Sequence, residues 1–106
     1  MIKVSIKSDK ECNINYIFVS GHANYSVSGS DIVCAAVSTA MYMTANLIEK
    51  VCPGYTFLEN EKEATMELKI TESNEFTNIA LNNLVETLES LELDYKKYIK
   101  INKIWN

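Results

Sequence analysis

The chain has 106 residues, of which 47% are hydrophobic and 23% are charged, and its formal net charge is −4. This length allows one domain with its own core, residues 1–106, and is too short for two. The basic residues are ten lysines with no arginine. Because nucleic-acid interfaces rely on arginine for phosphate and guanine contacts, this composition disfavours direct nucleic-acid binding.

The N-terminal segment alternates apolar and polar side chains and lacks the continuous apolar run of a signal peptide. No other run approaches the length that crosses a bilayer, so we expect a cytoplasmic protein with no membrane contact. The cysteines, Cys12, Cys34 and Cys52, are widely spaced and include no C-x-x-C pair. With a single histidine in the chain, this pattern argues against a metal site and indicates free thiols, and no cofactor is expected.

The first half of the chain predicts two strands and a helix. Residues 2–7 alternate apolar and polar side chains, and residues 14–20 are rich in β-branched and aromatic ones, so the two segments should pair as an antiparallel hairpin. From Val33 to Val51 apolar residues recur at helical spacing, including Leu47 and Ile48. The sequence Cys-Pro-Gly at residues 52–54 should end this helix.

The second half repeats this order and adds a strand. Residues 55–58 and 64–70 are strand candidates joined by a charged turn. Ser73 is the expected N-cap of a second helix that ends near Leu93, and residues 95–105 form the last strand. The apolar face expected for the second helix consists of Phe76, Ile79, Ala80, Leu84, Leu88 and Leu91.

These elements predict an α+β fold in the order ββαββαβ. Only one face of each amphipathic strand is apolar, so both helices should cover the same face of a mostly antiparallel, five-stranded sheet. The order of the strands within the sheet does not follow from the sequence.

Residues 21–38, GHANYSVSGSDIVCAAVS, combine the residue types of a nucleophilic site. His22 ends the second strand, and Cys34 follows near the start of the first helix. If Ser30 or Asp31 is the N-cap, Cys34 lies in the first turn, where the helix dipole and unpaired N–H groups favour a thiolate. An imidazolium at His22 would favour it further, and the backbone N–H groups of Cys34 and Ala35 are candidate oxyanion-hole donors.

Plainer interpretations exist for both residues. A single histidine at a strand end is commonly a surface or hydrogen-bonded polar residue, and an unpaired cysteine is commonly a small buried hydrophobe. Cys34, however, lies to one side of the apolar stripe that includes Val33 and Val37. This position directs it toward the edge that could face a cleft.

The residues GHA at 21–23 and VCAAVS at 33–38 resemble the two motifs of the Prp family of bacterial ribosomal-processing cysteine proteases. The resemblance implies that Cys34 is the nucleophile and His22 the general acid/base. It also implies two helices on one face of a five-stranded sheet, with a cleft between the second strand and the first helix. The implied reaction removes a short N-terminal extension from a large-subunit ribosomal protein. The extension ends in aromatic residues, so an apolar subsite is expected, and family members tend to form homodimers.

Two further residues could support this site. Ser38 ends the second motif one helical turn after Cys34 and can reach the same cleft, although such a serine equally often packs or bonds to the backbone. Asp31 either caps the helix or orients His22. We favour the cap, because a local bond to the backbone needs no ordered loop.

The segment from Gly21 to Ile32, which contains Tyr25 and Gly29, shows no periodicity and is expected to be mobile until substrate orders it. Cys12 and Cys52 match neither motif and are read as incidental. Two other functions stay open from the residues alone. One is a non-catalytic ribosome-associated binding or assembly module, and the other is a thiol redox or acyl-transfer enzyme using Cys34.

Overall fold

The computed structural model describes residues 1–21 and 30–105, and the order of its elements confirms the predicted ββαββαβ arrangement. The elements are β1 (Ile2–Ser8), β2 (Ile14–Ser20), α1 (Ser30–Val51), β3 (Tyr55–Asn60), β4 (Thr65–Ile70), α2 (Glu75–Asp94) and β5 (Ile99–Trp105).

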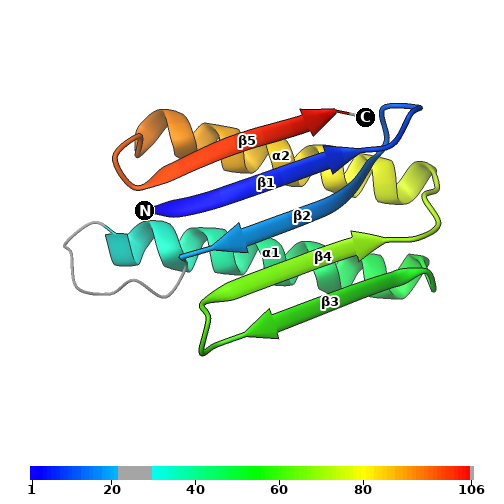
Figure 1. Ribbon diagram of the computed structural model, residues 1–106. Helices are drawn as coiled ribbons and strands as arrows, with labels where there is room; N and C mark the ends of the chain where they lie inside the picture. Colours follow the sequence, from blue (N-terminus) through cyan, green and yellow to red (C-terminus); the bar gives the residue numbers. More distant parts are fainter. Residues whose placement is uncertain (22–29, 106) are drawn as a thin grey trace.

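The five strands form one sheet in the order β3-β4-β2-β1-β5. The pairs β1–β2, β2–β4 and β3–β4 are antiparallel, and only β1–β5 is parallel, with Ile2 opposite Ile99. Figure 1 shows both helices behind this sheet, covering one face and leaving the other bare. The predicted helix-on-sheet layers are therefore confirmed, and the strand order is new information.

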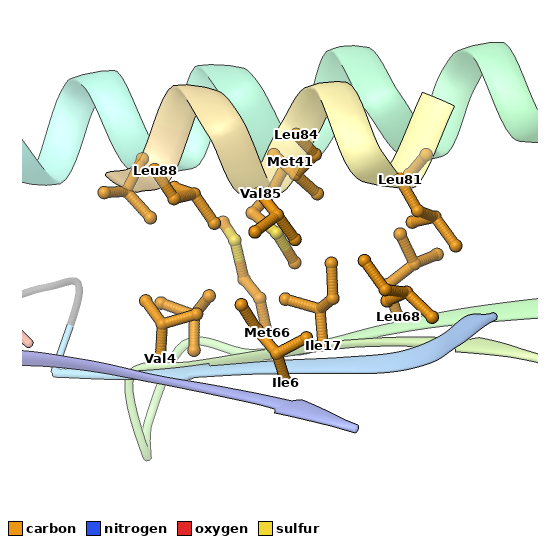
Figure 2. Close-up of a cluster of buried hydrophobic side chains, with 14 of the residues drawn as sticks. Val4, Ile6, Ile17, Met41, Met66, Leu68, Leu81, Leu84, Val85 and Leu88 are labelled. Atoms are coloured by element: carbon orange, nitrogen blue, oxygen red, sulfur yellow. The ribbon is translucent and has the colours of Figure 1, made fainter. Parts of the chain in front are cut away.

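The core lies between the two layers. Alternate residues of β1, β2 and β4 point toward the helices, where they are almost completely buried. Figure 2 shows these side chains facing those of the helices across the interface. The labelled core residues are Val4, Ile6, Ile17, Met66 and Leu68 from the sheet, and Met41, Leu81, Leu84, Val85 and Leu88 from the helices.

Helix α1 buries a stripe at the spacing of a regular helix. Its buried residues are Val33, Val37, Met41, Ala45 and Ile48. Leu47 and Val51, expected on this stripe, are exposed, because steps of four and then three residues from Met41 place Ala45 and Ile48 against the sheet. The helix ends at Val51, before Pro53, as predicted.

By length and apolar composition alone, residues 32–51 of α1 are sufficient to cross a bilayer, contrary to our expectation that no run approaches that length. A core helix that packs an apolar stripe against a sheet can have the same length and apolar composition, and α1 packs in this way. The stripe is buried between the layers, whereas Met43 on the outer side is 68% exposed.

Helix α2 begins one residue later than expected. Its N-cap is Asn74 rather than Ser73. The Asn74 Oδ1 atom accepts a hydrogen bond of 2.8 Å from the Thr77 N–H, and the Thr77 Oγ1 atom accepts one of 2.9 Å from the Asn74 N–H. This reciprocal capping box satisfies two backbone donors at once, which Ser73 cannot do from its position.

The buried face of α2 also differs from the predicted one. Phe76 and Ile79 are exposed, at 43% and 62%, whereas Leu81 and Val85 are buried. The helix carries apolar residues on two overlapping faces, so periodicity alone does not decide which of them meets the sheet. The buried residues are Thr77, Ala80, Leu81, Leu84, Val85 and Leu88.

Two strand boundaries shift by two residues or more. Strand β3 continues to Asn60, beyond the predicted end at Leu58, and the Asn60 Oδ1 atom accepts a hydrogen bond of 3.0 Å from the Glu63 N–H in the turn to β4. Strand β5 begins at Ile99 rather than Tyr95. The preceding residues form a turn, closed by a 2.9 Å hydrogen bond from the Tyr98 N–H to the Tyr95 carbonyl.

Candidate active site

Cys34 is the fifth residue of α1, because the helix begins at Ser30. Neither Ser30 nor Asp31 is therefore the N-cap, and Cys34 lies just past the first turn instead of within it. In a regular α-helix the N–H groups of Cys34 and Ala35 face the carbonyls of Ser30 and Asp31. The unpaired N–H groups of the helix end precede them, so their oxyanion role stays a prediction.

The thiol of Cys34 lies beside the end of β2. Its Sγ atom is 4.0 Å from the carbonyl oxygen of Gly21, toward which the thiol donates a weak hydrogen bond. The side chain is half-buried and packs against the core, whereas Val33 and Val37 of the stripe are fully buried. The end of β2 and the start of α1 thus meet at Cys34.

Gly21 is required by the geometry of this contact. Its φ angle is +81°, a conformation that side-chain-bearing residues rarely adopt. A Cβ atom here would lie 2.7 Å from the carbonyl oxygen of Met1. The Gly21 N–H also donates a 3.0 Å hydrogen bond to the carbonyl of Ala64. Three neighbouring segments therefore fix the residue that precedes His22.

Several predicted site residues lie outside the described residues. These are His22, Tyr25 and Gly29, and with them the predicted mobility of the Gly21 to Ile32 segment stays a prediction. Ser38 lies on α1 one turn after Cys34 and is half-buried, so it shares the face on which Cys34 lies.

The other two cysteines differ from Cys34 in their surroundings. Cys12 is exposed in the turn between β1 and β2. Cys52 is buried past the far end of α1, and its thiol donates a 3.4 Å hydrogen bond to the carbonyl of Glu72. Within residues 1–21 and 30–105, no cluster of three or more His, Cys, Asp or Glu side chains could hold a metal ion.

A hollow of about 360 Å³ opens at the same end of the sheet as Gly21, between the end of α2 and the start of β5. Met1 connects the two places, because it lines the hollow and its carbonyl faces Gly21. Glu92 is anchored there by a 2.7 Å hydrogen bond from the Ile101 N–H. Periodicity does not predict this hollow, since Met1 reaches it from the opposite end of the chain. The lining residues are Met1, Glu92, Leu93, Lys96, Ile99 and Lys100.

The comparison with known families shows which family the chain belongs to. Residues 1–100 match the family model described as cysteine protease Prp. The chain belongs to this family. It is 25% identical over 105 residues to the ribosomal processing cysteine protease Prp of Staphylococcus aureus strain Mu50, covering 96% of this chain and 98% of that protein. It is 27% identical over 103 residues to the Mycoplasma genitalium protein of the same name, covering 97% and 96%.

Solved structures confirm the fold. The chain superimposes with a TM-score of 0.92 on the S. aureus Prp protease crystallised with a substrate peptide, at 22% identity, covering 98% of this chain and all of that one. The S. aureus protease with a covalently linked product peptide gives 0.86 at 23% identity, with the same coverage. The chain that contains Cys34 is thus a cysteine protease of the Prp family.

Proposed function

We propose that this cysteine protease is an endopeptidase that removes a short N-terminal extension from a large-subunit ribosomal protein, with Cys34 as nucleophile and His22 as general acid/base. The observation that carries the proposal is the 4.0 Å approach of the Cys34 Sγ atom to the carbonyl of Gly21. Gly21 directly precedes the one histidine of the chain. The names of the relatives and the peptide complexes of the S. aureus protease support it.

The chemistry requires two steps at this site. The Cys34 thiolate attacks the scissile carbonyl carbon, and collapse of the tetrahedral intermediate breaks the C–N bond while His22 donates a proton to the departing amine. Water, deprotonated by His22, then attacks the thioester and releases the new carboxylate. Collapse of this second intermediate expels the Cys34 thiolate, and the proton taken from water stays on His22, which restores the starting pair.

The family resemblance suggests the substrate, and two features of the chain are compatible with it. The net charge of the chain, −4, complements a basic ribosomal protein. The hollow with Met1, Leu93 and Ile99 in its wall is our candidate for the subsite of the aromatic residues before the cut. We further expect the enzyme to act in the cytoplasm and as a homodimer, following the family resemblance.

The proposal is tested by incubating the purified chain with a large-subunit ribosomal protein that carries its N-terminal extension, and measuring intact masses. Wild-type enzyme should shorten the substrate at one bond, and Cys34→Ala should reduce the rate at least ~10³-fold. Cys12→Ser is the matched control and should retain activity. Binding without cleavage by both wild type and Cys34→Ala would instead indicate a binding module.

Thiol labelling tests the nucleophile separately from the substrate. With iodoacetamide near neutral pH, Cys34 should react faster than the exposed Cys12, although Cys34 is half-buried. The His22→Ala variant should slow labelling of Cys34 and leave that of Cys12 unchanged. Preferential labelling of Cys12 in the wild-type protein would remove the basis for the assignment.

A further inference from the structure

The face of the sheet opposite the helices, here called the open face, is bare in Figure 1. The pairing register arranges its residues in three rows across β3, β4, β2, β1 and β5. The rows are Asn60, Thr65, Ser20, Lys3 and Lys100; then Leu58, Glu67, Phe18, Ser5 and Asn102; and then Thr56, Lys69, Tyr16, Lys7 and Ile104.

The charge of the open face is opposite to that of the rest of the molecule. The face holds four lysines and one glutamate, whereas the remaining residues of the chain hold six lysines and thirteen acidic residues. All four lysines are exposed, and within the described part of the chain none of them forms an ion pair. Lys3 and Lys100 are direct register partners, an unfavourable arrangement of like charges that an anion would relieve.

Two aromatic rings occupy the central strand of the open face. Tyr16 and Phe18 are half-buried, and their rings are nearly parallel, at 6°, with centroids 6.4 Å apart. The Lys7 Nζ atom lies 4.8 Å from the Tyr16 ring centroid, and the Tyr16 hydroxyl donates a 2.9 Å hydrogen bond to Glu67. These contacts hold the Tyr16 ring in place and occupy one oxygen of the Glu67 carboxylate.

The surface is hollowed on both sides of these rings. One hollow, of about 290 Å³, lies at the β3 side and is lined by Phe18 and Leu58, with Glu59 and Glu67 at its wall. The second, of about 370 Å³, is lined by Lys7, Tyr16 and Lys69 among others. In each hollow an aromatic side chain lies beside a space that a planar group such as a nucleobase could fill. Two lysines also line the second hollow.

We propose that the open face binds single-stranded RNA, with the four lysines contacting phosphates and Tyr16 and Phe18 stacking on bases. Sheet faces that carry central aromatic residues and surrounding basic ones bind unpaired nucleotides in this way. Lysines without arginine suit contacts to the phosphate backbone that do not depend on sequence. The whole-chain composition obscures this property, because the fold collects four lysines on one face and most carboxylates elsewhere.

Two other occupants are less compatible with these features. In duplex RNA the bases are stacked inside the helix, so they cannot reach the two rings. A second copy of the chain docked face to face would bring two sets of four lysines together, which is electrostatically unfavourable. The charge and the aromatic residues therefore both favour an unpaired polyanion.

Fluorescence anisotropy with a labelled single-stranded RNA of about 12 nucleotides tests the proposal, since one such site spans roughly 4–16 nucleotides. We expect a Kd on the order of 10⁻⁵ M at low salt. A triple substitution of Lys3, Lys69 and Lys100 by Gln should weaken binding at least ~10-fold and reduce the salt slope by about 2. The matched control substitutes Lys10, Lys62 and Lys97 by Gln, with the same charge change off the open face, and should have less than ~2-fold effect.

A second variant tests stacking apart from charge. Phe18→Leu keeps the apolar bulk but removes the aromatic ring, so it should weaken binding about 5-fold or more without changing the salt slope. If this variant proves unstable, the lysine comparison still decides. Absence of binding up to ~10⁻⁴ M protein, equal weakening by both lysine triples, or equal affinity for duplex RNA would overturn the proposal. A further result would also overturn it: the protein forms a dimer that the open-face lysine triple dissociates and the control triple does not, and it binds no RNA.

Discussion

Gly21 connects the end of β2 to the proposed nucleophile, since its carbonyl oxygen lies beside the Cys34 thiol. The Gly21→Ala variant would force a side chain into a φ of +81° and against the Met1 carbonyl. We expect it to lower stability by about 2 kcal/mol and also to reduce turnover, because the backbone entering His22 must shift. Chemical denaturation and peptide cleavage measure the two effects.

Gly54→Ala is the control for this variant. Its Cβ would also meet a close atom, the Thr71 Oγ1 at 2.7 Å, but Gly54 follows the far end of α1 and its neighbour is a side chain. It should alter stability without a specific loss of turnover in the folded protein. If Gly21→Ala matched wild type in both measurements, the described geometry at the end of β2 would be unnecessary for function.

Asp31 can be assigned by separating stability from turnover. As the second residue of α1 it is no longer a candidate N-cap, but a carboxylate in the first turn still complements the helix dipole. We expect Asp31→Asn to cost about 0.3–1 kcal/mol and to keep most of the turnover. Turnover as low as that of His22→Ala, at an unchanged melting temperature, would show instead that Asp31 orients the histidine.

At the scale of elements, the start of α2 depends on the N-cap Asn74, one residue after the predicted Ser73. Asn74→Ala removes the hydrogen bond to the Thr77 N–H and should lower stability by about 1 kcal/mol, with no specific effect on cleavage. Ser73→Ala, one residue earlier, should be nearly neutral. Thermal unfolding of both variants compares the two cap positions, and a larger loss for Ser73→Ala would contradict the capping box.

The same helix shows what local patterns can predict. Periodicity predicts the existence of α2 and its end near Leu93, and both are confirmed, since the helix ends at Asp94. The choice between Leu81 with Val85 and Phe76 with Ile79 as the buried pair did not follow, because each pair fits an amphipathic helix. Packing against the sheet selected the first pair.

At the scale of the whole molecule, the core packs the helix layer against the sheet. Substitutions of two methionines of α1 test how much this packing contributes to stability. Met41 is fully buried between the layers, whereas Met43 is 68% exposed on the outside. We expect Met41→Ala to cost roughly 2–5 kcal/mol, because the cavity cannot be filled by its neighbours. Met43→Ala should change stability by less than ~0.5 kcal/mol. Similar losses in the two variants would mean that the outer face of α1 is also covered in solution.

The sequence by itself determined the seven elements, their order and the layer of two helices on one sheet face. The motifs and their spacing also suggested His22 and Cys34 as a catalytic pair. These properties depend on periodicity and on residues close in the chain. Only the tertiary structure decided the strand order, the parallel pairing of β1 with β5, and the contact of Gly21 with Met1 and Cys34. Such features arise from residues far apart in sequence, whose pairing no local pattern specifies.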